Sequence, residues 1–249
     1  MQLGLRPPES LSDPAKVGFY LLYGKASYHL YFLLVALQAY LLIPLLLPLA
    51  RLRLSIWTMF GLGLLMQMAV YELNLRWFNW TYPGSQVLWY TLPLMLGVGV
   101  VARFDDFAAW FKRYFWLLMA LLLGSAGAYL PLAVSAMQGQ RVNNLHYNLS
   151  AWLFTSLCAV CICGACLLWQ QKALWLRGVV AWFGLVSLKV YLLHPALLQL
   201  AERWWPPAGP EGQRLALVGL IGGLALLVSA LLGHLLLRLP RLSLFLFGR

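Results

Sequence analysis

The 249 residues are 62% hydrophobic and only 10% charged, and their formal net charge is +11. Soluble domains are about half apolar and about a quarter charged, so this composition excludes an ordinary soluble protein and predicts a polytopic membrane protein. The basic residues punctuate apolar runs and form no extended basic face, which argues against binding to nucleic acid. We therefore expect an all-α membrane helix bundle.

The first segment of the chain covers residues 1–27. It is polar, contains Pro7, Pro8 and Pro14, and carries a short amphipathic patch at 17–23. A bilayer core requires roughly 20 apolar residues, so the patch is too short to cross and we predict an interfacial segment. No basic region followed by an apolar core occurs here, so no signal peptide is predicted.

Residues 28–237 are predicted to form the transmembrane bundle, and residues 238–249 a cytoplasmic tail. Seven apolar runs are candidate spans, and the third is the shortest. They lie at about 28–50, 54–72, 86–102, 114–134, 149–169, 178–200 and 215–237.

Basic residues are distributed unequally between the alternate loops of these spans. One set of loops, together with the tail, contains Arg51, Arg53, Arg103, Lys112, Arg113, Lys172, Arg177, Arg238, Arg241 and Arg249. The opposite set contains Arg76, Arg141, Arg203 and Arg214, and the N-terminal segment adds Arg6, Lys16 and Lys25. Because basic residues accumulate in cytoplasmic loops, we predict that the N-terminus lies outside and the C-terminus in the cytoplasm.

All four cysteines lie in the fifth predicted span, at positions 158, 161, 163 and 166. On a helix they spread over about 200°, so they cannot converge on one metal ion. We interpret them as packing residues and predict no metal site.

Two stretches resemble the acyltransferase type 3 superfamily of integral membrane enzymes. Tyr28-His29-Leu30-Tyr31-Phe32-Leu33, followed by Gln38, Tyr40 and Pro44, resembles the family pattern H-L-W-F-L…Y-L…P. Ser187-Leu188-Lys189-Val190-Tyr191-Leu192-Leu193-His194-Pro195 resembles S-F-G-I-Y-L-I-H-P, with lysine where the family usually has glycine. The two stretches occur in the family's order.

This resemblance implies an enzyme that acylates sugars or other surface molecules and takes its acyl group from a cytosolic acyl-coenzyme A. Such enzymes have about ten helices, and the segment with His29 opens roughly the fourth. We therefore expect the sequence to correspond to the C-terminal two thirds of such an enzyme, with three helices on a preceding segment or a partner chain. The family's catalytic histidine follows a basic residue by about ten positions in the first helix, and no residue here matches it.

Lys189 is the most informative single residue of the sequence. It lies near the middle of the predicted span 178–200, where a lysine costs roughly 2.5–3.5 kcal/mol on insertion scales. We predict that it faces a cavity or pairs with a partner, and that it stabilises a developing oxyanion. The alternative is a span centred a few residues away, from which Lys189 snorkels to the interface.

Four other residues are candidates for the site. The resemblance implies that His29 shapes the central cavity, although an interfacial capping role is the alternative. His194 either contributes to the site or satisfies a carbonyl that is freed near Pro195. Arg103 and Arg113 are candidates for binding the phosphates of coenzyme A, because arginine forms bidentate hydrogen bonds to phosphate. A purely topological role for both arginines is the alternative.

The leading hypothesis is an acyltransferase of a bacterial inner membrane that O-acetylates a sugar, glycan or lipid-linked saccharide. Acetyl-coenzyme A or another acyl-coenzyme A is the expected donor, and the expected partners are membrane lipids and the glycan acceptor. The alternative is a non-catalytic membrane subunit that binds or passes a lipid or glycan for a partner. A transporter is less favoured, because the seven spans show no internal repeat.

Overall fold

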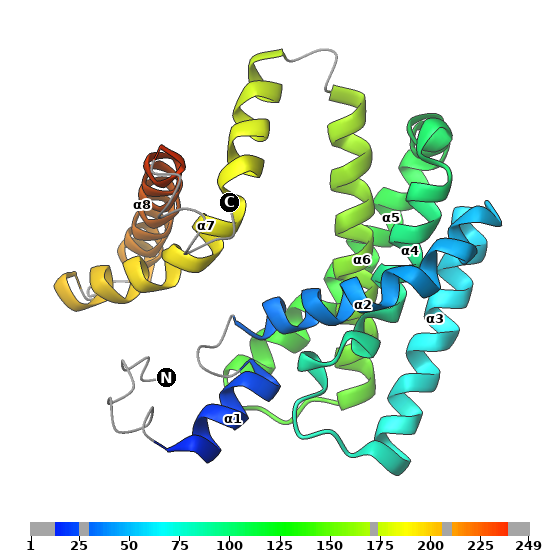
Figure 1. Cartoon of the computed structure of the whole chain (residues 1–249), viewed down its shortest axis with the longest axis horizontal. Coiled ribbons are helices and arrows are strands. Elements are labelled where there is room, and N and C mark those ends of the chain that lie inside the picture. The colour runs from blue at the N-terminus through cyan, green and yellow to red at the C-terminus, as the bar shows by residue number, and fades with distance from the viewer. Residues whose placement is uncertain (1–12, 25–29, 170–173, 206–210, 239–249) are drawn as a thin grey trace. The chain divides into compact units, whose positions relative to one another are not determined.

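The computed structural model describes residues 13–24, 30–169, 174–205 and 211–238. Within these residues there are helices and no strands, which confirms the predicted all-α class. They divide into two compact units, the first with α1 to α6 and the second with α7 and α8 (Figure 1). The α-helices are α1 (Pro14–Tyr23), α2 (Tyr31–Arg51), α3 (Ile56–Leu73), α4 (Thr91–Ala102), α5 (Phe104–Met137), α6 (Asn144–Trp169), α7 (Leu174–Trp204) and α8 (Glu211–Leu237).

Six helical stretches are long and apolar enough to cross a membrane. They are Tyr31–Arg51, Ile56–Phe78, Phe104–Met137, Asn144–Trp169, Arg177–Ala201 and Ala216–Leu237. A seventh apolar stretch, Val87–Ala102, is shorter. Each of the seven predicted spans therefore overlaps a helix, and the third is the shortest, as the sequence indicated. Which side of the membrane each helix end faces stays a prediction.

The N-terminal amphipathic patch forms α1, whose two ends are set by local chemistry. The side chain of Asp13 caps the first turn by accepting a hydrogen bond of 3.0 Å from the Ala15 N–H, and Pro14 stands in the first helical position. Gly24 ends the helix with φ +61°, a left-handed conformation that favours glycine. The helix has ten residues, so it is too short to span a bilayer.

Helices α3 and α4 pack closely because two glycines remove side chains from their interface. A Cβ atom at Gly63 would lie 2.9 Å from the Met95 Cβ, and one at Gly99 would lie 3.0 Å from the Met59 Cβ. Small residues at such positions let two membrane helices approach each other closely. In Figure 1, α2 runs across the other helices of this unit, and it contacts α4.

Helix α5 is longer than a membrane requires, and it packs along α6. Its 34 residues span about 50 Å, against about 30 Å for the hydrocarbon core, so one end must project from the membrane. The ring of Phe111 lies directly over Gly164 of α6, in the place that a Cβ atom would occupy. Phe111 and the neighbouring Leu118 are almost completely buried, so this contact belongs to the core of the first unit.

The second unit is the pair of helices α7 and α8. Its closest approach is at Gly233, where an added Cβ atom would lie 2.9 Å from the Lys189 Cβ and 3.5 Å from the Val186 Cβ. Val186 and Lys189 are both buried, at 0% and 3% exposure. Lys189 therefore lies on the face of α7 that packs against α8.

Candidate functional site

An irregular stretch between α3 and α4 forms one wall of the candidate site. The end of α3 continues into a π-helical turn, η2 (Asn74–Phe78), and two short 3₁₀ segments, η3 (Pro83–Ser85) and η4 (Val87–Tyr90), lead into α4. Such backbone leaves N–H and C=O groups without the regular bonds of a helix. Within a membrane protein these groups must find partners in the protein itself.

Two glutamines from neighbouring helices supply these partners. Gln38 of α2 donates from Nε2 to the Ser85 carbonyl at 3.1 Å and accepts from the Val87 N–H at 2.7 Å. Gln67 of α3, which has 0% exposure, donates to the Trp89 carbonyl at 3.0 Å. Its Oε1 accepts from the Thr91 hydroxyl at 3.0 Å and the Leu92 N–H at 3.2 Å. The two amides thereby fix the start of α4.

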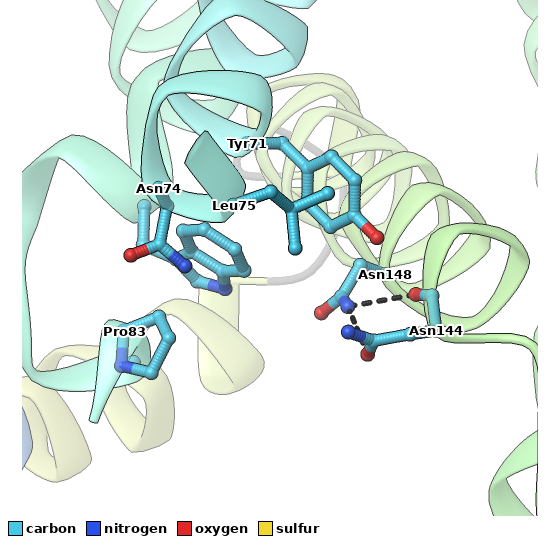
Figure 2. Close-up of a pocket in the computed structure, with 8 residues that line it drawn as sticks. Tyr71, Asn74, Leu75, Pro83, Asn144 and Asn148 are labelled. Carbon is cyan, nitrogen blue, oxygen red and sulfur yellow. Dashed lines mark hydrogen bonds between the residues drawn. The ribbon is translucent and has the colours of Figure 1, made fainter. Parts of the chain in front are cut away.

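Next to this stretch lies a cavity of about 250 Å³ (Figure 2). Its lining residues come from the end of α3, from η2, η3 and η4, and from the first turns of α6: Tyr71, Asn74, Leu75, Pro83, Gly84, Trp89, Asn144 and Asn148. In Figure 2 the Tyr71 hydroxyl and the two asparagines of α6 lie on one side of the pocket, and Asn74 and Pro83 lie on the other. We call this cavity the amide pocket.

The walls of the amide pocket are held by aromatic packing and by hydrogen bonds. The ring centroids of Tyr71 and Trp89 are 6.0 Å apart, and Trp152 lies behind both, at 6.0 and 5.2 Å. Asn148 donates from Nδ2 to the backbone carbonyl and the Oδ1 of Asn144, at 2.8 and 2.9 Å. Asn74 accepts at Oδ1 from the Trp80 N–H at 2.9 Å, which stabilises the turn after η2.

Several polar groups of the pocket keep hydrogen-bonding capacity. In the described part of the chain, no hydrogen bond engages the Tyr71 hydroxyl, the Asn74 Nδ2 or the Asn148 Oδ1. The lining therefore offers neutral donors and acceptors beside aromatic rings, and it includes no charged side chain. A larger hollow of about 530 Å³ between α5 and α6 is lined almost entirely by apolar residues, so it is less suited to recognising a polar substrate.

The second unit contains two of the predicted site residues. Lys189 is 3% exposed, so its side chain is buried where α7 packs against α8. This burial argues against the alternative in which Lys189 snorkels to the membrane interface. The Nδ1 of His194 lies 2.9 Å from the Val190 carbonyl on the same helix. The Val190 carbonyl lies one helical turn before His194 and is not the carbonyl that Pro195 frees, which belongs to Tyr191, so both interpretations of His194 stay predictions. His29 lies outside the described residues.

The two predicted coenzyme A ligands differ in their surroundings. Arg103 precedes α5, and its Nε donates to the carbonyls of Arg53 and Leu54 at 3.0 and 3.1 Å. Arg113 lies ten residues further along the chain, about 15 Å of helical rise, with its guanidinium carbon 5.5 Å from the centroid of the Tyr114 ring. No contact in the described residues joins these two arginines.

A metal centre finds no support among the described residues, where no three His, Cys, Asp or Glu side chains come close enough to hold an ion. All four cysteines of α6 are free thiols, from the buried Cys161 to the exposed Cys166. Only Cys161 is buried, so the interpretation of all four as packing residues stays a prediction.

Neither the residues that line the amide pocket nor the buried Gln67 beside it were predicted from the sequence as site residues. Asn144 and Asn148 lay before the predicted start of the fifth span at 149, whereas α6 begins at Asn144. Gln67 lay inside a predicted span without being singled out. A neutral amide within an apolar run was the available signal, because such a group must find a partner inside the bundle.

The fold is that of a polytopic membrane helix bundle. A family model described as an acyltransferase domain matches residues 4–234, which is most of the chain, so the protein belongs to this acyltransferase family. No curated protein and no solved structure matches the chain. The family resemblance inferred from the two motifs is therefore confirmed.

Proposed function

We propose that this protein works as an O-acyltransferase of a bacterial inner membrane, which transfers an acetyl group from cytosolic acetyl-coenzyme A to a sugar, glycan or lipid-linked saccharide. Family membership supports acyl transfer in a membrane. The observation that favours a sugar acceptor is the amide pocket, which offers neutral amides and a phenol beside aromatic rings.

The pocket chemistry matches a carbohydrate better than an amine or a carboxylate. A sugar presents hydroxyl groups, which both donate and accept hydrogen bonds, and patches of C–H groups that pack on aromatic faces. A charged acceptor would require an opposite charge to offset its loss of hydration, and the lining has none. We propose that Asn144, Asn148 and Tyr71 bind acceptor hydroxyls.

The proposed reaction transfers the acyl group to an acceptor hydroxyl. The hydroxyl oxygen attacks the thioester carbonyl carbon while a general base takes its proton. The tetrahedral intermediate then collapses, the C–S bond breaks, and coenzyme A leaves as a thiol after protonation. Lys189 is the proposed stabiliser of the oxyanion, since a preorganised charge in a low-dielectric site lowers the energy of such an intermediate.

The remaining proposed roles follow the family resemblance. His29 is proposed to shape the cavity, and His194 to support the helix that carries Lys189. The test of the acceptor site is the variant Asn148→Ala, with Gln138→Ala as a control, because Gln138 is an exposed amide outside the pocket.

We expect Asn148→Ala to raise the KM for the acceptor about tenfold, the effect of losing one or two hydrogen bonds, without changing the KM for acetyl-coenzyme A. Gln138→Ala should change neither constant. Steady-state kinetics in membranes from cells that carry the native gene context provide the measurement. An unchanged acceptor KM in Asn148→Ala contradicts the assignment of the pocket, and the absence of any acyl transfer by the wild type supports the non-catalytic subunit instead.

A further inference from the structure

Two arginines meet at the end of the first unit where the α2–α3 loop approaches the start of α5. The Nε of Arg53 donates to the Ala102 carbonyl at 3.2 Å. In return, the Nε of Arg103 donates to the carbonyls of Arg53 and Leu54 at 3.0 and 3.1 Å. Each arginine therefore bonds to backbone beside the other, and two like charges are held close together.

The hydrogen bonds of this pair use only one edge of each guanidinium. Within the described residues, no hydrogen bond or ion pair engages the terminal nitrogens Nη1 and Nη2 of Arg53 or Arg103. Two Nη–H groups of one guanidinium form a fork that matches two oxygens of a phosphate. Arg53 is exposed and Arg103 is half-buried, so a ligand can reach the pair from solvent.

No carboxylate of the described residues forms an ion pair with either arginine. Among the described residues the ion pairs are Lys16–Asp13 and Arg76–Glu72, and neither involves this region. Asp105 and Asp106 lie in the first turn of α5, but neither carboxylate is within 4 Å of a nitrogen of Arg53 or Arg103. Arg51, the last residue of α2, is also exposed and adds a third positive charge two residues before Arg53.

Two features of the backbone beside the arginines also favour an anion-binding site. Arg53 has φ +47°, a left-handed conformation that is uncommon for a residue other than glycine, and strain of this kind concentrates at functional sites. Helix α5 begins after Arg103 without a side-chain cap, whereas α3 is capped by the Ser55 hydroxyl. The first N–H groups of α5 therefore add to the positive potential beside the arginines.

We propose that Arg53 and Arg103 together form a binding site for a phosphate group at the end of the bundle that is predicted to face the cytosol. The site shares Arg103 with the pair suggested by the sequence and adds Arg53, whereas the role of Arg113 stays a prediction. Two sources can supply the phosphate, the donor coenzyme A or the headgroup of an anionic membrane lipid. Binding of coenzyme A at this site rests on the proposed function, whereas binding of a lipid headgroup does not.

The test measures binding without turnover, so it does not depend on catalysis. The purified full-length chain is placed in nanodiscs, and two probes are used. The first probe compares the affinities of coenzyme A and 3′-dephospho-coenzyme A for the protein in phosphatidylcholine discs, measured by calorimetry. The second is the enrichment of phosphatidylglycerol over phosphatidylcholine, measured by native mass spectrometry. Arg53→Gln is the test variant, and Arg53→Lys retains the charge without the fork. Arg141→Gln is the control for loss of one charge, because Arg141 is an exposed arginine between α5 and α6 of the same unit.

We expect Arg53→Gln to weaken phosphate binding about tenfold or more in one of the two probes, Arg53→Lys to weaken it less, and Arg141→Gln to change it less than about threefold. A response to coenzyme A identifies the donor as the source, and a response to phosphatidylglycerol identifies the lipid. Equal losses in Arg53→Gln and Arg141→Gln, or no loss in Arg53→Gln, overturn the proposal. The melting temperature of each variant excludes unfolding as the cause. If the site binds coenzyme A and acyl transfer is absent, the proposed function fails and this inference stands.

Discussion

Each of the two units of the protein contains a buried polar side chain, and their surroundings differ. Gln67 in the first unit is fully buried, and its amide bonds to three groups at the start of α4. Lys189 in the second unit is 3% exposed and lies in the middle of α7, with its aliphatic stem against Gly233. Both residues stand in stretches that are apolar enough to cross a membrane.

The surroundings of Gln67 show a structural reason for its polar side chain, whereas the proposed reason for Lys189 is functional. The irregular backbone before α4 needs hydrogen-bond partners, and Gln67 meets this need without introducing a charge. The backbone of α7 is regular at Lys189, so the helix itself creates no need for an ammonium group there. A buried lysine is costly in an apolar span, and the proposed function assigns this one to catalysis. Four substitutions test this contrast.

The largest expected effect is on activity, in Lys189→Met. Methionine has a similar length and no charge, so the α7–α8 contact should persist while the oxyanion loses its stabilising charge. We expect the rate of acyl transfer to fall about 100-fold or more, with an unchanged or higher melting temperature. Release of coenzyme A from acetyl-coenzyme A in membranes provides the measurement. Full activity in Lys189→Met rules out the catalytic role.

Next in size is the effect of Gln67→Leu on stability. Leucine fills a similar volume but leaves the Leu92 N–H and the Trp89 carbonyl without their partner. We expect a loss of about 2–3 kcal/mol in the free energy of unfolding. Denaturant titration in detergent measures it. If the variant unfolds at the same denaturant concentration as the wild type, water or a local rearrangement replaces the hydrogen bonds of the amide.

Gly233→Ala should disturb the packing around Lys189 by a smaller amount. The new Cβ atom would lie 2.9 Å from the Lys189 Cβ, so the helices must separate slightly, at a cost of about 1–3 kcal/mol. Gly222→Ala on the same helix is the control, because nothing lies within 4 Å of its added Cβ. Thermal unfolding of the two variants should therefore shift in opposite directions or by clearly unequal amounts.

The smallest of the four effects is expected in Gln38→Leu. Its amide has two partners, the Ser85 carbonyl and the Val87 N–H, and both hydrogen bonds are only partly buried. Water can replace part of what is lost, so we expect about 1 kcal/mol of destabilisation in the same denaturant titration. A loss equal to that of Gln67→Leu would show that the two glutamines act as one network.

Much of the architecture could be predicted from the sequence, since a helix in a membrane must be long and apolar whatever surrounds it. All seven predicted spans overlap helices, and the shortness of the third was anticipated. The start of α6 was placed five residues too late, because Asn144 to Asn148 contains polar residues that a hydropathy argument assigns to a loop. The tertiary fold makes this turn a wall of the amide pocket.

The candidate sites show the same division. The family could be inferred from two short motifs, and the depth of Lys189 followed from its place in an apolar run. The partnership of Arg103 with Arg53 could not be predicted, because 50 residues separate them along the chain and only the pairing of α3 with α4 brings them together. Composition and local patterns alone thus determined the class of protein, the positions of its helices and its family. Tertiary structure decided which polar groups meet, because hydrogen bonds depend on distances between helices that no local pattern specifies.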